Sequence, residues 1–285
     1  MKKLLFQLDT DAHAAVFDTV VGFDGGADHV IGHGGCNPSN VRPLVDGAIF
    51  TRAPKEKKNT AIFLGGSDMR AGEALLEAVR KVFFADFRVS VMLDSNGSNT
   101  TAAAAAAKLL GSGSVKGKRA VVLAGTGPVG RRAAVMLARE GARVSLTSRD
   151  GARAAEACRE IKQRFGVEVS PTGAATEADR GRAIAGAEVI VSAGATGVQL
   201  LNEEQWKISP TLKMIADANA TPPLGVAGVD MMDRGKERHG KIVWGAIGFG
   251  TLKLAVHRAC IAHLFERNDL VLDAEEIFAL AKSMA

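Results

Sequence analysis

The chain has 285 residues, of which 47% are apolar, and a formal net charge of +5 at pH 7, so it can bury a sizeable core as one large domain or two modest ones. The basic residues are scattered, which does not indicate nucleic-acid binding, and no segment approaches the ~20 apolar residues of a membrane span. The apolar run at 4–6 is too short for a signal peptide and the three cysteines show no disulfide framework, so we expect a cytoplasmic protein.

Strands and helices alternate through the first 95 residues. Apolar runs predict strands at 3–8, 29–31, 60–64 and 88–93. Between them we expect a helix over 12–21, a broken helix over 38–46, and a long helix over 67–84 that Ser67 or Asp68 caps. This alternation predicts a first α/β domain, separate from the one that follows.

A dense polar loop at 94–101 follows the last of these strands and opens a helix that runs through six consecutive alanines to Leu110. Alanine is the best helix former, so the alanine run needs no other explanation. The glycine and serine residues at 111–114 then predict a flexible boundary between the two domains.

A glycine-rich turn follows the next strand, at 120–124, and precedes a helix over 131–140. Gly125 permits a tight turn, Gly127 lets the backbone approach a pyrophosphate, and Gly130 allows close packing of helix on strand. The phosphates would lie over the free N–H groups at the helix N-terminus. Because the spacing lies between a strand and a helix, it predicts a dinucleotide site.

The end of the second strand of this domain, 142–147, indicates which dinucleotide binds. An NAD enzyme usually places Asp or Glu here against the ribose hydroxyls, whereas this strand ends in Thr147, Ser148 and Arg149. A hydroxyl and a guanidinium can bind a 2′-phosphate, which favours NADP over NAD as the cofactor. The predicted cofactor-binding residues are Gly125, Thr126, Gly127, Pro128, Val129, Gly130, Ser148, Arg149, Ala193 and Gly194.

The βα pattern continues to 244, where we expect the last strand, and the two closing helices at 251–265 and 273–285 lie outside it. The sequence therefore predicts an α/β protein with two domains. We expect residues 1–111 with 251–285 to form one α/β domain, to which the C-terminal helices return. Residues 112–250 form a Rossmann-type domain with a doubly wound parallel sheet.

Other chemistry-bearing groups do not form a site in the sequence. His29, His33 and Cys36 supply only three donors where a structural zinc site uses four, and His257, Cys260 and His263 do not share a helix face, so no metal is predicted. No arrangement for nucleophilic catalysis stands out. A hydride-transfer enzyme needs none, because its cofactor supplies the chemistry while the protein binds and orients.

Several stretches resemble the bacterial NAD(P)-dependent methylene-tetrahydromethanopterin dehydrogenases of methylotrophs. The resemblance extends over essentially the whole chain, and the polar loop is far more specific than the glycine spacing. The matching stretches are 2–11, 16–22, 24–28, 92–103, 120–130, 252–254, 257–262 and 273–277.

The resemblance implies oxidation of methylene-tetrahydromethanopterin to the methenyl cation, with hydride passing to NAD(P)+. The site is then expected in a cleft between the domains, with Ser95, Asn96 and Asn99 contacting the pterin or holding their loop. Phe17 would pack against the flat ring system, and Lys253 would face the folate-like ring. Alternatively, Phe17 belongs to the core, the loop groups cap the alanine helix, and Lys253 is solvated.

Three alternatives stay open at this point. Tetrahydrofolate could replace tetrahydromethanopterin, giving a methylene-tetrahydrofolate dehydrogenase. A shikimate-dehydrogenase-like enzyme would share the architecture but needs a Lys/Asp pair that we cannot place, and a non-catalytic NADP sensor would not need the polar loop at 94–101. The family resemblance also implies a homo-oligomer, with a trimer as the expected form.

Overall fold

The computed structural model describes residues 1–285 and divides into two compact units. Unit 1 comprises 1–100 with 254–280, and unit 2 comprises 101–253 with 281–285. The boundaries fall inside two long helices, α4 (Ser98–Ser112) and α9 (Ala246–Leu264), instead of at 111/112 and 250/251. The expected boundary loop at 111–114 is shortened because the alanine helix continues through its first two residues.

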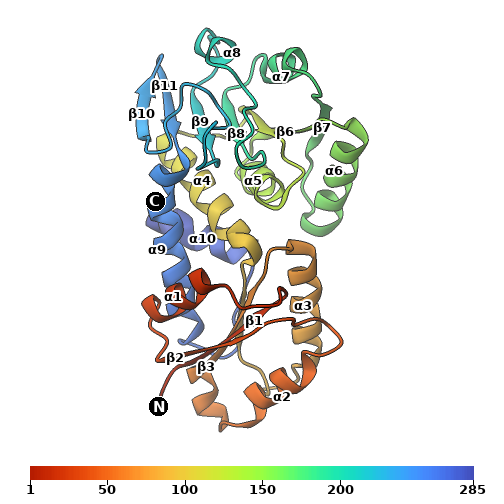
Figure 1. The fold of residues 1–285 in the computed structure, drawn as a ribbon, viewed down its shortest axis with the longest axis vertical. Helices are drawn as coiled ribbons and strands as arrows, with labels where there is room; N and C mark the ends of the chain where they lie inside the picture. The colour runs from red at the N-terminus through yellow and green to blue at the C-terminus, as the bar shows by residue number, and fades with distance from the viewer. The chain divides into compact units, whose positions relative to one another are not determined.

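Unit 1 is built on a five-stranded sheet in the order β12-β4-β3-β1-β2, in which every pairing is parallel (Figure 1). Its strands are β1 (Leu4–Asp9), β2 (His29–His33), β3 (Thr60–Gly65), β4 (Ser90–Leu93) and β12 (Val271–Leu272). Because β12 pairs with β4, the C-terminal part of the chain does return to the first unit, as the sequence predicted.

Helices of unit 1 pack on this sheet and bury its apolar runs. Asp68 caps α3 by accepting hydrogen bonds from the N–H groups of Arg70 and Ala71, in agreement with the sequence. A core of fully buried residues joins α2 and α3 to the strands, with Val45, Ile62 and Leu75 at its centre. The helices are α1 (Val16–Asp24), α2 (Arg42–Phe50), α3 (Met69–Val82) and α10 (Ala274–Met284), with 3-10 turns η1 (Pro54–Asn59) and η2 (Ser95–Gly97).

The first helix begins at Val16, whereas we expected it to begin at residue 12. The buried carboxylate of Asp9 accepts hydrogen bonds from the N–H groups of Asp11 (2.9 Å) and Ala15 (3.1 Å). These two bonds hold the intervening residues as a turn, so Asp9 closes the connection between β1 and α1 without being the helix N-cap.

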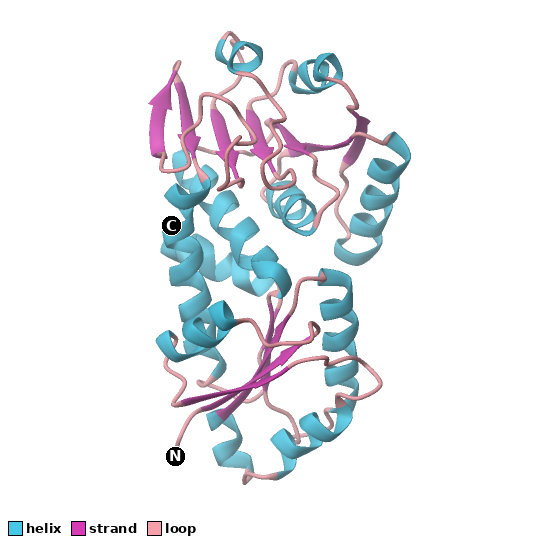
Figure 2. Ribbon diagram, viewed as in Figure 1, coloured by secondary structure: helices cyan, strands magenta, loops and turns pink.

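Unit 2 contains a seven-stranded sheet in the order β10-β11-β9-β8-β5-β6-β7 (Figures 1 and 2). Counting from β5, six strands follow the doubly wound order 3-2-1-4-5-6, and β10 is added antiparallel to β11. The predicted Rossmann-type fold is therefore confirmed. Its strands are β5 (Arg119–Leu123), β6 (Arg143–Ser148), β7 (Ser170–Gly173), β8 (Val189–Ser192), β9 (Met214–Asp217), β10 (Arg234–Arg238) and β11 (Lys241–Trp244).

The helices of unit 2 are α5 (Pro128–Arg139), α6 (Gly151–Phe165), α7 (Glu177–Ile184) and the short α8 (Glu203–Lys207). Neither α8 nor β10 was predicted from the sequence. The predicted last strand was 241–244, whereas β12 follows it. No helix of the chain combines the length and apolarity needed to cross a membrane.

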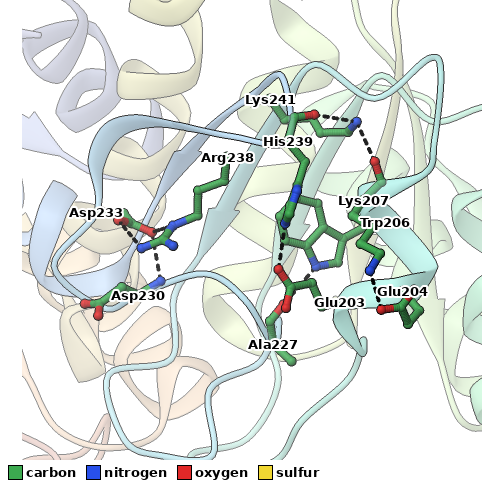
Figure 3. Close-up of polar contacts among 10 residues, drawn as sticks. All are labelled: Glu203, Glu204, Trp206, Lys207, Ala227, Asp230, Asp233, Arg238, His239 and Lys241. Carbon is green, nitrogen blue, oxygen red and sulfur yellow. Dashed lines mark hydrogen bonds and ion pairs between the residues drawn. The ribbon is translucent and has the colours of Figure 1, made fainter.

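Polar contacts hold the outer edge of this sheet together (Figure 3). Trp206 of α8 is fully buried, and its Nε1 donates to the carbonyl of Ala227 at 2.8 Å. The ammonium group of Lys241 donates to the carbonyls of Lys207 and His239, both at 2.9 Å. The indole of Trp206 thus joins α8 to the loop that contains Ala227, and the buried ammonium group of Lys241 joins β11 to the end of α8.

Helix α9 begins at Ala246, five residues before the predicted start. The N–H groups of Ile247 and Gly248 donate to the carbonyl of Met231, which supplies the partners that the first turn of a helix lacks. A Cβ on Gly248 would lie 1.7 Å from the carbonyl oxygen of Asp233. This glycine therefore marks a close backbone approach within the helix and not the loop that the sequence suggested.

Candidate functional site

The turn between β5 and α5 has the geometry that the glycine spacing predicts. A Cβ on Gly130 would lie 2.5 Å from the Cα of Gly125, so the helix and the turn approach too closely for any side chain. At Gly127, by contrast, a Cβ would meet nothing within 4 Å. The first and third positions thus serve packing inside the chain, whereas the second leaves open space where a phosphate group can approach.

The start of α5 supplies hydrogen-bond donors beside this space. Gly127 is the N-cap and Pro128 is the first residue, so the N–H groups of Val129 and Gly130 lie in a first turn that has no intrahelical acceptors. Arg131 braces the turn, because its Nε donates to the carbonyl of Thr126 at 2.8 Å and its guanidinium pairs with Glu160 of α6. The donors and the helix dipole both favour an anion here.

The end of β6 carries the hydroxyl and the guanidinium that the sequence assigned to a 2′-phosphate. Ser148 is buried, and its hydroxyl accepts a hydrogen bond from the N–H of Asp150 at 3.3 Å. Arg149 is exposed and forms no hydrogen bond or ion pair with the rest of the chain. Asp150 uses its carboxylate to cap α6 through the N–H of Ala152. The cation at this strand end is therefore available to a ligand.

Arg153, which the sequence analysis did not single out, lies four residues after Arg149 in the first turn of α6 and is also exposed. The rule that residues four apart share a helix face does not apply to this pair, because Arg149 precedes α6. The only sequence signal for Arg153 was that it lies close to Arg149 in the chain. The end of β6 and the start of α6 thus carry two exposed arginines.

Ala193 and Gly194 follow β8, whose neighbour in the sheet is β5. The N–H of Ala193 donates to the carbonyl of Leu123 at 3.1 Å, which continues the ladder past the end of the strands. A Cβ on Gly194 would touch Leu200 at 3.0 Å. The sheet order reverses between β5 and β8, and ligands of such folds bind at the carboxyl edge of that point. All ten predicted cofactor residues belong to unit 2.

In unit 1 the polar loop at 94–101 is mostly buried and is organised by Asp94. The carboxylate of Asp94 accepts from the N–H of Asn99 (2.8 Å) and from the hydroxyl of Thr100 (2.6 Å). The amide of Asn99 donates to the carbonyl of Leu93 and to Asp273, and the hydroxyl of Ser95 donates to the carbonyl of Gly65. Ser95 and Asn99 are fully buried, so the geometry supports their role in holding the loop and not direct contact with a ligand.

Asn96 is the exposed member of this loop, and it adopts a left-handed conformation with φ of 54°. Its N–H donates to the carbonyl of Gly66 at 2.6 Å, which joins the loop after β4 to the loop after β3. A non-glycine residue in this conformation is uncommon, and asparagine tolerates it best. The amide side chain is therefore presented at the carboxyl edge of the unit 1 sheet.

Phe17 is 49% exposed on α1, so it does not belong to the core, and its ring centroid lies 6.4 Å from that of His257. The sequence placed His257 on a helix and outside any metal site. It is fully buried, stacks on Phe63 at 5.3 Å, and places Nδ1 3.9 Å from Asp94. Since its partners come from β3 and from the polar loop, no local pattern could have identified it.

Lys253 is the eighth residue of α9 and half-buried. We had expected it near the start of a helix, and this expectation was wrong. Lys253 lies four residues before His257 and hence on the same face of the helix. The predicted substrate residues are thus divided, since Phe17, Ser95, Asn96 and Asn99 belong to unit 1 whereas Lys253 is the last residue of the long segment of unit 2. No group of His, Cys, Asp and Glu side chains is arranged to hold a metal ion.

Comparison with known proteins identifies relatives over the whole chain. Residues 16–96 match a family described as methylene-tetrahydromethanopterin dehydrogenase, N-terminal. The chain is 56% identical over 286 residues to the "Bifunctional protein MdtA" of Methylorubrum extorquens, covering 100% of this chain and 99% of the relative. It is 32% identical over 294 residues to the NAD(P)-dependent methylenetetrahydromethanopterin dehydrogenase of the same organism, with the same coverage.

Solved structures share the fold at low sequence identity. A shikimate 5-dehydrogenase from Listeria monocytogenes is similar with a TM-score of 0.57 and 10% identity, covering 100% of this chain and 96% of that one. A methylenetetrahydrofolate dehydrogenase-cyclohydrolase from Trypanosoma brucei is similar with a TM-score of 0.53 and 15% identity, covering 93% and 86%. At these identities the likeness concerns the architecture alone.

Proposed function

The chain belongs to the methylene-tetrahydromethanopterin dehydrogenase family, and we propose that it transfers a hydride from methylene-tetrahydromethanopterin to NADP+, giving methenyl-tetrahydromethanopterin. The observation that carries the proposal is the full-length relation to that family, together with a glycine turn whose open position lies at the start of α5. The direct test is the absorbance of NADPH formed when the chain is mixed with NADP+ and either methylene-tetrahydromethanopterin or methylene-tetrahydrofolate.

The chemistry of the substrate requires no nucleophile or strong base from the chain. The hydride leaves a carbon that is flanked by two nitrogen atoms, and their lone pairs stabilise the resulting cation. The cofactor, when bound, accepts the hydride. The chain then has to hold the donor carbon about 3–3.5 Å from the acceptor and in line with it. We assign this orienting work to Lys253, Phe17 and Asn96, with Ser95 and Asn99 holding the loop that carries Asn96.

NADP is the cofactor that the residues fit best. The open position at Gly127 and the N–H groups of the first turn of α5 can receive the pyrophosphate. At the end of β6, Arg149 and Arg153 are exposed, and the carboxylate between them in the sequence, Asp150, accepts a hydrogen bond from the N–H of Ala152 as the cap of α6. A cation without an internal partner is suited to a 2′-phosphate and gives no advantage with the ribose hydroxyls of NAD+.

Arg149→Ala is expected to weaken NADP+ far more than NAD+. Loss of a charge-assisted hydrogen bond typically costs about 1.5–3 kcal/mol, or roughly 10- to 150-fold in affinity. Titration calorimetry with both cofactors measures the difference. Arg159→Ala is the matched control, because Arg159 is also exposed on α6 but pairs with Glu156 at the surface. Equal losses for both cofactors, or a wild-type preference for NAD+, would contradict the assignment.

The second expectation concerns the substrate. We predict a higher kcat/KM with methylene-tetrahydromethanopterin than with methylene-tetrahydrofolate, because the relation to the tetrahydromethanopterin family extends over the whole chain. The ratio of the two kcat/KM values is the proper measure, since it compares the two substrates in their transition states. Initial rates with each pterin at saturating NADP+ give the ratio. A clear preference for the folate would instead make the chain a methylene-tetrahydrofolate dehydrogenase.

We further propose that the protein acts in the cytoplasm as a homo-oligomer, in the one-carbon pathway by which methylotrophs oxidise formaldehyde. All three cysteines are free and buried, which is usual in a reducing compartment. The family relation supports the pathway, and a trimer is the expected assembly. Light scattering coupled to size-exclusion chromatography measures the mass against the 29.7 kDa of one chain. A monomeric mass would exclude the assembly.

A further inference from the structure

Two polar residues, Ser192 and Asp217, end neighbouring strands of the unit 2 sheet. They are the last residues of β8 and β9, and they are paired in the register of the two strands. Both are buried, with exposed fractions of 0% and 1%. A carboxyl group buried at the ligand-binding edge of a Rossmann-type sheet needs a physical reason, because a charge is costly to remove from water.

The carboxylate of Asp217 holds both ends of the loop that follows β9. One oxygen accepts from the N–H of Val226 at 2.8 Å, and the other accepts from the N–H of Asn219 at 3.2 Å. Burial raises the pKa of the Asp217 carboxyl above its usual value, and the hydrogen bonds that it accepts oppose this shift. The geometry is that of a clamp, in which a single side chain closes the loop 218–226.

Gly225 shows how tightly the clamp is packed. A Cβ on Gly225 would lie 2.2 Å from the hydroxyl of Ser192 and 2.6 Å from the carboxylate of Asp217. The carbonyl of Gly225 accepts from the N–H groups of Leu200 and Leu201, at 2.8 and 3.1 Å. The loop after β9 is therefore joined to the loop that follows β8 and carries Ala193 and Gly194.

The residue that follows this loop, Ala227, is anchored independently of Asp217. The N–H of Ala227 donates to the carbonyl of Leu201 at 3.0 Å, and the carbonyl of Ala227 accepts from the indole of Trp206 (Figure 3). Because this outer anchor does not involve the carboxylate, removal of the clamp should loosen the inner part of the loop and leave the fold of unit 2 in place.

The place of the clamp in the sheet indicates its function. A doubly wound fold binds the two halves of a dinucleotide on the two halves of its sheet, on either side of the switch point between β5 and β8. Arg149 at the end of β6 belongs to the half for the adenosine 2′-phosphate. The loops after β8 and β9 consequently belong to the half that receives the nicotinamide.

We propose that Asp217 is a positioning residue for hydride transfer, which fixes the loop 218–226 as the wall that orients the nicotinamide half of NADP. The inference rests on the proposed function for the identity of the cofactor. The inference also separates two roles in unit 2: Arg149 contributes affinity for the adenosine half of NADP, and Asp217 orients the nicotinamide half.

Asp217→Asn is the test, because the amide keeps the shape of the side chain but turns one acceptor into a donor that faces an N–H group. We expect kcat to fall about tenfold or more, since misplacement of a reacting group lowers the rate steeply. Affinity for adenosine 2′,5′-bisphosphate, which lacks the nicotinamide, should stay within about twofold, whereas NADP+ should lose part of its advantage over that fragment. Calorimetry measures both affinities without any turnover.

Two further variants keep the test decisive. Gly225→Ala displaces the loop from an unchanged carboxylate and should reproduce the effect if Asp217→Asn does not fold. Asp179→Asn is the control, because Asp179 also accepts two hydrogen bonds, from Thr176, but belongs to the capping box of α7 instead of holding the loop. It should leave kcat and the affinity ratio unchanged.

A folded Asp217→Asn variant with wild-type kcat and affinity ratio would overturn the inference, and so would an equal loss of affinity for the fragment and for NADP+. Failure of the proposed function is distinguishable from either outcome. In that case the wild-type chain forms no NADPH with methylene-pterin, while the ratio of the two affinities still reports on the nicotinamide wall.

Discussion

Gly130→Ala is expected to abolish measurable NADP+ binding and to destabilise unit 2. The added methyl group would lie 2.5 Å from the Cα and 2.8 Å from the carbonyl group of Gly125, and backbone atoms cannot move aside as a flexible side chain can. The methyl group would push α5 away from the turn, and overfilling a packed site in this way typically lowers the free energy of unfolding by about 1–3 kcal/mol. It also moves the N–H groups of α5 away from the phosphates. Calorimetry and thermal unfolding measure the two effects.

Gly127→Ala separates binding from packing at the same turn. A methyl group at this position meets nothing within 4 Å in the chain, so the unfolding temperature should stay at the wild-type value. It would occupy the space that the pyrophosphate needs, and NADP+ affinity should fall about 100-fold or more if most phosphate contacts are lost. Gly111→Ala, in α4, is the neutral control, because its methyl group also meets nothing. Unchanged NADP+ affinity in Gly127→Ala would place the phosphates elsewhere.

The cofactor turn could be predicted because its information is local. A buried strand, three glycines at fixed spacing and an apolar helix follow one another within about twenty residues, and the close approach of Gly130 to Gly125 lies within that stretch. The same holds for the cap of α3 by Asp68, which needs only the next three residues. Such patterns can be recognised without knowledge of the tertiary contacts.

Other parts of the fold depend on contacts that no local pattern contains. Strand β10 is polar along its length, and it forms because β11 lies opposite and because Arg238 pairs with the buried carboxylate of Asp233. The early start of α9 depends on a carbonyl from Met231, fifteen residues before the helix. Propensity alone could predict neither feature, since tertiary partners decided both.

The candidate site shows the same division. The sequence identified the loop at 94–101 as chemically important but could not separate its members by role. Asn99 is buried because its amide reaches Asp273, 174 residues later, whereas Asn96 is exposed because of its left-handed backbone. The surroundings of His257 could not be predicted, because its ring partners, Phe63 and Phe17, come from β3 and α1. The residue type therefore determines what chemistry a side chain can perform, whereas the fold determines whether that side chain is exposed to a ligand or buried.

Lys253→Ala is expected to lower kcat about 100-fold while NADP+ affinity and the fold stay near wild type, since a misplaced reacting group loses about that factor. Lys253 lies in the middle of α9 and not at its start, so its backbone is held by helix on both sides. A fixed ammonium group close to the reacting carbon would oppose a reaction that creates a cation. Its long stem, however, can orient the substrate ring through one nitrogen or carbonyl contact while the charge stays off-centre, so we assign it positioning and not proton transfer.

Lys253→Met tests this assignment, because methionine keeps the length of the side chain and removes the hydrogen bond. It should be nearly as slow as Lys253→Ala, whereas a role in packing alone would let methionine restore activity. Arg258→Ala is the matched control on the same helix. Arg258 pairs with Asp24 at the surface, where an ion pair contributes about 0–1 kcal/mol, so its loss should leave kcat unchanged. If either Lys253 variant turned over at the wild-type rate, the substrate would have to be oriented by Phe17 and Asn96 instead, from the carboxyl edge of the unit 1 sheet.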